Sequence, residues 1–146
     1  MPNCFGSVKI GSVSLDISQR SVEGVMIFKL SGRLTVGVAD TIRDRVIEEL
    51  EKGQTRFVMD LADLSYIDST GLGSLVMCYT TAQKSNGTVK LLNLNKRNIE
   101  LLYLTKLHTI FETFSDEQDA VNSFFPDRKI QRFDILNFVQ EHEKDQ

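Results

Sequence analysis

The spacing of apolar residues along the middle of this chain switches repeatedly between the period of a helix and the period of a strand. Ile42, Val46 and Leu50 recur at helical spacing within 39–52, and a short apolar run follows at 56–61. Two further helical stretches, each followed by an apolar run, come before residue 115. Parallel strands must be joined by crossovers, and a helix is the usual crossover. The alternation therefore predicts an α/β fold on a partly parallel sheet.

Each predicted element has its own boundary signals. A turn at 22–24 joins the first two strands into a hairpin, Gly32 ends the second strand, and Gly53 caps the first helix. The predicted strands are 13–19, 25–30, 56–61, 89–94 and 110–114, and the predicted helices are 39–52, 69–85, 96–105 and 116–125. This set predicts a mixed sheet of four or five strands with helices packed mainly on one face.

The last twenty or so residues form a separate unit in the sequence. Pro126 ends the preceding helix, and Phe133, Leu136 and Val139 then lie on one helical stripe. We divide the chain into one domain, 1–125, and a C-terminal helical extension, 126–146. The apolar stripe must be buried, and packing on the same domain is favoured over a homodimer contact or a second binding site.

Composition narrows the classes of function. The 146 residues suffice for one domain with its own core, and the net charge of −3 argues against a nucleic-acid partner. No apolar run approaches the roughly 20 residues of a membrane span, and the first six residues lack the features of a signal peptide. We therefore expect no membrane association and a cytoplasmic location. Cys4, Cys78, His108 and His142 are isolated in the sequence, so free thiols, no metal site and no cofactor are expected.

The segment from Asp68 to Gly73 combines a helix start with a serine. Asp68 is a good N-cap residue, and Ser69 follows it in the first turn. Unpaired N–H groups and the positive end of the helix dipole favour a phosphate at such a position. The plainer interpretation is that Ser69 and Asp68 only cap a helix and that the glycines only allow close packing.

A longer run around this segment resembles a known family. Residues 61–73 read LADLSYIDSTGLG, which is similar to the signature of STAS-domain anti-sigma factor antagonists, and the resemblance extends from about Leu15 to Phe124. It implies a STAS-like fold with Ser69 as the phosphorylation site and Thr70 as a minor alternative. It further implies that the unphosphorylated protein binds an anti-sigma factor with serine kinase activity and releases the sigma factor. Phosphorylation then switches binding off, and a phosphatase resets the switch.

A helical projection of the segment after Ser69 predicts which side chains face a partner. Leu72, Leu75, Val76 and Tyr79 define the inward face. Met77 should be exposed, either as part of a docking patch or by chance. The expected partner-binding residues are Asp68, Ser69, Thr70, Gly71, Gly73, Ser74, Met77, Arg33 and Thr35.

The chain departs from the family pattern after its second predicted strand. Many similar antagonists carry Gly-Glu-Leu/Ile-Asp there, whereas this chain has Gly32-Arg33-Leu34-Thr35. The two positions that are acidic in those antagonists hold the basic Arg33 and the neutral Thr35 in this chain. If this loop touches the partner, the charge of the partner's surface should differ as well.

Three other kinds of function remain as alternatives. An enzyme is disfavoured because GxSxG, Walker and HExxH motifs are absent from the sequence, although His108 could approach Ser69 in space. A STAS scaffold or ligand sensor of a larger signalling assembly would share the same motif. A soluble subunit of a transport system would share it too.

Overall fold

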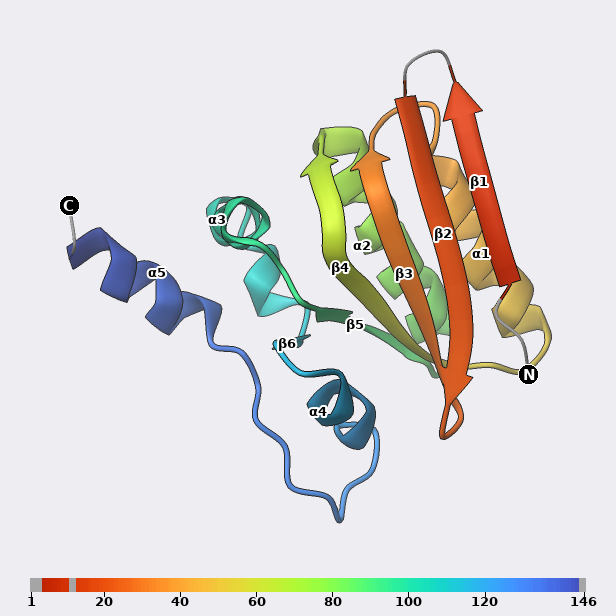
Figure 1. The fold of residues 1–146 in the computed structure, drawn as a ribbon. Coiled ribbons are helices and arrows are strands. Elements are labelled where there is room, and N and C mark those ends of the chain that lie inside the picture. The colour runs from red at the N-terminus through yellow and green to blue at the C-terminus, as the bar shows by residue number, and fades with distance from the viewer. Residues whose placement is uncertain (1–3, 11–12, 145–146) are drawn as a thin grey trace.

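A single six-stranded sheet forms the centre of the computed structural model, which describes residues 4–10 and 13–144 (Figure 1). The strands, in sheet order, are β1 (Cys4–Ile10), β2 (Val13–Val22), β3 (Val25–Leu34), β4 (Arg56–Ile67), β5 (Thr88–Leu92) and β6 (Thr113–Phe114). The helices are α1 (Ala39–Glu51), α2 (Ser69–Lys84), α3 (Lys96–Leu104), α4 (Glu117–Asn122) and α5 (Ile135–Lys144), with a short 3-10 turn η1 (Leu107–Thr109).

The sheet is mixed, as the sequence predicts. β1, β2 and β3 pair antiparallel, whereas β3, β4, β5 and β6 pair parallel. Helix α1 crosses from β3 to β4 and α2 crosses from β4 to β5. The α/β class is thus confirmed, with one strand more than the predicted four or five. That strand, β1, pairs with Val13–Gln19 of β2, and its sequence alternates only briefly, with Val8 and Ile10 against Ser7 and Lys9.

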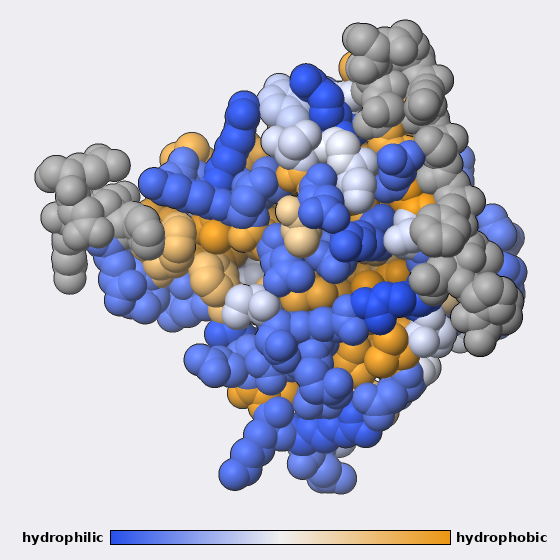
Figure 2. All heavy atoms as spheres, in the orientation of Figure 1, coloured by the Kyte–Doolittle hydropathy of each residue, from blue (hydrophilic) through white to orange (hydrophobic). Residues whose placement is uncertain are grey.

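Helices cover mainly one face of the sheet. α1, α2, α3 and α5 share one large core with the inward residues of the central strands, and there the rings of Phe28 and Phe57 stack at 6.0 Å between centroids. Alternate residues, such as Ile27 and Val58, point to the opposite face and pack with α4 in a smaller cluster. Figure 1 places α1 and α2 behind the strands. Figure 2, in the same orientation, shows the face turned away from these two helices, where hydrophilic side chains predominate among the coloured residues.

Two central strands run further than the sequence predicts. Gly32 does not end β3, which continues to Leu34, and β4 continues past Leu61 to Ile67. The pairing of β3 with β4 shifts register on both sides of this region, and Gly32 adopts a φ of 107° that glycine tolerates. The hydroxyl of Ser65 donates a hydrogen bond to the Gly32 carbonyl at 2.8 Å. A bulged ladder therefore replaces the expected strand end.

The chain after Pro126 contacts the rest of the protein at several points. The Phe133 amide donates to the Thr113 carbonyl at 2.8 Å, and the Thr113 hydroxyl donates to the Phe133 carbonyl at 2.9 Å. Ile135 and Val139 are buried in the main core beside α3. These contacts cover the outer edge of β6, which would otherwise present unpaired backbone groups. The division at 125/126 stays a prediction.

One anchor of this segment is an ion-pair network around Glu112. Its carboxylate contacts Lys90 Nζ at 2.7 Å and Arg132 Nε at 2.6 Å. Burial alone raises the pKa of the Glu112 carboxyl, but the hydrogen bonds from Lys90 and Arg132 outweigh that effect and hold the pKa below its ordinary value of 4.5.

Glu112→Gln should therefore lower the free energy of unfolding in a pH-dependent way. Because the folded pKa is lowered, the carboxylate's contribution is fully present above the ordinary pKa and is lost as pH falls through the folded value. Urea unfolding of both proteins at neutral and acidic pH measures it. We expect the difference in the free energy of unfolding between wild type and Glu112→Gln to shrink toward low pH. A difference that does not change with pH would contradict the role of the ion pairs.

Candidate functional site

The N-terminus of α2 lies where β3 and β4 end, and Asp68 joins these elements. Its carboxylate accepts a hydrogen bond from the Gly71 amide at 2.7 Å and another from the Val36 amide at 3.2 Å. Its own amide donates to the Leu34 carbonyl at 3.2 Å. Asp68 is thus the N-cap of α2, as predicted, and it also fixes the loop that follows β3.

Gly71 lets the first turn of α2 approach β3 closely. A Cβ built on Gly71 would lie 2.1 Å from the Leu34 carbonyl oxygen and 2.9 Å from its carbonyl carbon. Such distances are far inside van der Waals contact, so no other residue fits this backbone placement. Gly73, two residues on, has nothing within 4 Å of the same position.

Ser69 and Thr70 are exposed on the outside of this first turn. Within the described part of the chain, neither hydroxyl takes part in a hydrogen bond. Ser69 is therefore accessible to a modifying enzyme at a helix N-terminus, where backbone N–H groups and the helix dipole favour added negative charge.

Two exposed apolar side chains lie on the elements around the serine. Val36, in the loop held by Asp68, is 68% exposed, and Met77, two turns along α2, is 46% exposed. Met77 is exposed as predicted. Sequence reasoning missed Val36, although an aliphatic residue followed directly by Gly37 in a short loop is a signal that could have found it.

Three residues of the predicted partner-binding set are buried. The projection placed Ser74 outward, and this is wrong: Ser74 is 7% exposed and its hydroxyl donates to the Ala39 carbonyl at 2.6 Å. The reason is that α2 packs on both the sheet and α1, so its covered face is wider than one stripe. Thr35 is also 7% exposed, with its carbonyl accepting from Val38 and Ala39 at the start of α1. Gly71 is buried against β3.

The remaining predicted residues are accessible to different degrees. Arg33, Ser69, Thr70, Gly73 and Met77 are exposed, and Asp68 is half-buried. The accessible surface at this end of the sheet thus comprises the first turn of α2, the loop after β3 and the end of β3 itself.

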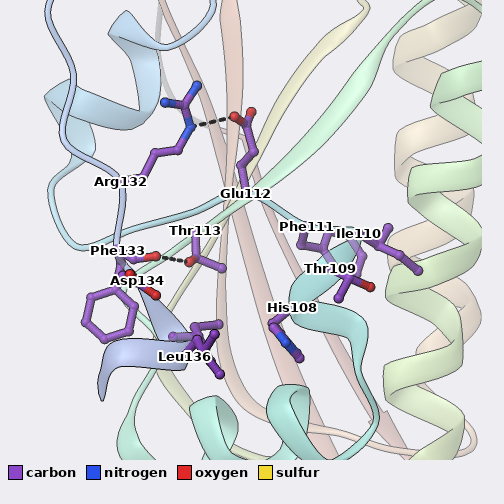
Figure 3. A pocket seen from close by; sticks show the side chains of 11 residues that line it. His108, Thr109, Ile110, Phe111, Glu112, Thr113, Arg132, Phe133, Asp134 and Leu136 are labelled. Atoms are coloured by element: carbon purple, nitrogen blue, oxygen red, sulfur yellow. Dashed lines mark hydrogen bonds and ion pairs between the residues drawn. The ribbon is translucent and has the colours of Figure 1, made fainter. Parts of the chain in front are cut away.

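A second concave feature lies away from α2. A cavity of about 490 Å³ opens between η1, residues 110–113 that lead into β6, and residues 132–136 at the start of α5 (Figure 3). His108 lines it together with Arg132 and Leu136, and its ring lies 5.4 Å from that of Tyr103. No described hydrogen bond joins His108 to Ser69, so the structure does not pair this histidine with the serine as a base.

Other chemistry-bearing groups are sparse. Cys78 is a free, buried thiol, and burial raises its pKa to about 12, which keeps it protonated. The side chain of Cys4 lies outside those described. Among residues 4–10 and 13–144, no group of three His, Cys, Asp or Glu side chains is arranged to hold a metal ion. In the same ranges, no helix has the length and apolar character needed to cross a membrane.

Removing the cap carboxylate should destabilise the protein without touching its core. Asp68→Ala loses the bonds to the amides of Gly71 and Val36, and we expect a loss of about 1–2 kcal/mol in the free energy of unfolding. Asp68→Asn keeps one acceptor oxygen and should lose less. Urea unfolding of the three proteins measures the difference, and equal stabilities would contradict the capping role.

Comparison with known proteins places this site in a family. The model of the STAS domain matches residues 16–120. An anti-sigma-B factor antagonist of Bacillus subtilis is 30% identical over 110 residues, which are 75% of this chain and 98% of that protein. An anti-sigma F factor antagonist of Paenibacillus polymyxa is 27% identical over 110 residues, 75% of this chain and 94% of that protein.

Solved structures agree on the fold. The anti-sigma factor antagonist SpoIIAA in its unphosphorylated form superposes with a TM-score of 0.67 at 18% identity, covering 77% of this chain and 99% of that one. The phosphorylated form of SpoIIAA from Bacillus superposes with a TM-score of 0.60, also at 18% identity, and the match covers 74% of this chain and 98% of that one. The family match spans β4, the capped start of α2 and the exposed serine, and the chain belongs to the STAS domain family.

Proposed function

We propose that this chain is an anti-sigma factor antagonist that is switched by phosphorylation at Ser69. In its unphosphorylated form it binds an anti-sigma factor with serine kinase activity, and the sigma factor is released. The observation that carries the proposal is the exposed Ser69 hydroxyl at the capped N-terminus of α2, within the motif that resembles the family signature. Two relatives that this chain matches over nearly their whole length are named anti-sigma factor antagonists.

The chemistry of the site supports a switch that acts on binding and leaves the fold intact. A phosphate adds about −1.5 to −2 charges, and the helix dipole favours it by roughly 0.3–1 kcal/mol. A protein of the same fold has a structure in a phosphorylated form, so the fold can carry the group. A partner that covers Val36, Met77 and the first turn of α2 would meet this charge in a desolvated interface.

The proposal includes the other proteins that such a switch needs. The protein itself is non-catalytic, ATP is used by the kinase, and a phosphatase acting on phospho-Ser69 resets the state. Thr70, also exposed, is the minor alternative acceptor. The protein acts in the cytoplasm, where its partners are.

The alternatives have less support. One fold neighbour is an anion transporter, but the match covers 18% of that chain, whereas the antagonists are matched almost end to end. A scaffold of a larger assembly would use the same motif, and the size of the complexes formed distinguishes it.

Affinity capture from a lysate of the source organism tests the proposal. Wild type, Ser69→Ala and Ser69→Asp serve as baits, and mass spectrometry identifies the retained proteins. We expect wild type and Ser69→Ala to retain a small ATP-dependent kinase that Ser69→Asp loses. Retention of one large assembly by all three baits would favour the scaffold, and copurifying membrane components would favour the transport subunit.

A further inference from the structure

Two arginine side chains lie over one tyrosine ring at the end of the sheet. The guanidinium carbon of Arg33 is 4.7 Å from the centroid of the Tyr66 ring, and that of Arg97 is 4.9 Å from the same centroid. Both distances fall within the range of cation–π contacts. We call Arg33, Tyr66 and Arg97 the arginine–tyrosine cluster.

The cluster is built on rigid elements. Arg33 of β3 is the direct ladder partner of Tyr66 in β4. Arg97 is the second residue of α3, and the side-chain Nδ2 of Asn95, the N-cap of α3, donates to the Leu64 carbonyl at 3.2 Å. Residues from three segments far apart in the sequence are therefore held together before any partner binds, which lowers the entropy cost of binding.

The two positive charges have no internal counterpart. Arg33 and Arg97 are exposed, and neither forms an ion pair among the described residues. The carboxylate of Asp63, in the same strand as Tyr66, forms an ion pair with Lys29 Nζ at 3.2 Å. Both guanidinium groups lie within 5 Å of one ring centroid, so the two charges repel one another, and an anion bound beside them lowers that repulsion. The cluster is thus a cationic patch on a protein of net charge −3.

The cluster lies at the same end of the sheet as the serine. Ser69 follows Tyr66 by three residues, so their Cα atoms are within about 11 Å of each other. Leu34 and Ile67, the next ladder pair, point into the core, so Arg33 and Tyr66 point to the sheet face opposite α2. A partner that covers the first turn of α2 reaches the cluster by extending around this edge.

We propose that the arginine–tyrosine cluster docks an acidic segment of the anti-sigma factor, with its carboxylates bound by the two guanidinium groups. The proposal rests on the function proposed above and names the chemistry of its partner. Arginine offers a planar fork that matches a carboxylate in two parallel hydrogen bonds. Tyrosine and arginine are also the residue types that dominate binding energy at protein interfaces.

The docking site gives the phosphorylation switch a second mode of action. The cluster carries two positive charges, and a phosphate on Ser69 adds about −1.5 to −2. The Cα atoms of Tyr66 and Ser69 are at most about 11 Å apart, so the phosphate lowers the positive potential at the cluster by an amount that rises as the salt concentration falls. An acidic partner segment is then attracted less strongly to this end of the sheet at the same time as it meets the new charge.

A titration with small probes tests the site without the kinase. NMR spectra of the full chain are recorded with a tetraglutamate peptide, a tetralysine peptide and inorganic phosphate, for wild type and for Arg33→Gln/Arg97→Gln. We expect tetraglutamate alone to shift the side-chain Nε–H signals of both arginines and the backbone amide signal of Tyr66, and the double variant to lose the shift at Tyr66. Shifts spread over all basic residues, or a response to phosphate and none to tetraglutamate, would overturn the assignment.

Binding to the purified kinase partner provides the second test. Charge reversal in Arg33→Glu/Arg97→Glu should weaken binding at least tenfold and reduce its salt dependence. Lys84→Glu is the control, because it reverses an exposed charge at the far end of α2, about 22 Å from Ser69. Unfolding in urea confirms that each variant is folded.

The outcomes separate the two proposals. If Ser69→Asp abolishes binding while the double arginine variant and Lys84→Glu both bind like wild type, the docking site is wrong and the proposed function stands. If the arginine variant loses binding while Ser69→Asp binds like wild type, the docking site stands and the phosphorylation switch is wrong.

Discussion

Gly71→Ala is expected to lower the free energy of unfolding by about 2–3 kcal/mol, because the new methyl group has no room. Its Cβ would lie 2.1 Å from the Leu34 carbonyl oxygen, which belongs to the backbone of β3 and cannot rotate away. The start of α2 must move away from β3 to accommodate it. That movement also stretches the bonds by which Asp68 holds Leu34, Val36 and Gly71 together.

Gly73→Ala is the matched control for this prediction. The substitution is chemically the same, in the same helix, but nothing lies within 4 Å of the added Cβ. Alanine is the better helix former by about 1 kcal/mol, so Gly73→Ala should be as stable as wild type or more stable. Urea unfolding of the three proteins measures both effects. Equal free energies of unfolding for the two variants would mean that the close approach of α2 to β3 contributes nothing to stability.

Ser69→Asp is expected to weaken binding to the kinase partner by about 2–5 kcal/mol, which is roughly thirtyfold to several-thousandfold in affinity. The aspartate places a negative charge on the exposed first turn of α2, next to the carboxylate of Asp68. In an interface that excludes water, this charge has to be desolvated, and the helix dipole offsets only part of that cost. Titration calorimetry with the purified partner measures the change.

Two variants control for effects other than charge. Ser69→Ala removes the hydroxyl without adding charge and should bind within a few-fold of wild type. Thr70→Asp introduces the same charge one residue further along the exposed turn. Loss of binding in Ser69→Ala would mean that the hydroxyl itself makes the contact, which would contradict a switch based on added charge.

Much of the fold could be predicted from the sequence because the two apolar periods were clear. The helices that became α1, α2 and α3 were placed within a residue or two at each end, and the mixed sheet followed from their alternation with strands. β1 was not predicted, because the alternation of Val8 and Ile10 with Ser7 and Lys9 is short and its pairing with β2 appears only in the folded chain. The strand end expected at Gly32 was wrong, since a glycine can equally mark a bulge inside a continuing ladder.

The site was predicted where it depends on local sequence and was incomplete where it depends on packing. Asp68 as a cap and an exposed Ser69 follow from residue type and position at a helix start. Ser74 was misplaced because a projection of one helix cannot show that a second helix covers its flank. Arg97 was missed because only the folded chain brings it over the ring of Tyr66.

Phosphorylation of the purified protein by its kinase partner tests the central claim most directly. The complex of wild type, or of Ser69→Ala, with the kinase is incubated with ATP, and intact mass, peptide mapping and complex size are followed together. We expect wild type to gain one phosphoryl group, on Ser69, and to leave the complex, while Ser69→Ala stays unmodified and bound. A phosphate elsewhere in the chain, or phospho-Ser69 protein that remains bound, would contradict the account.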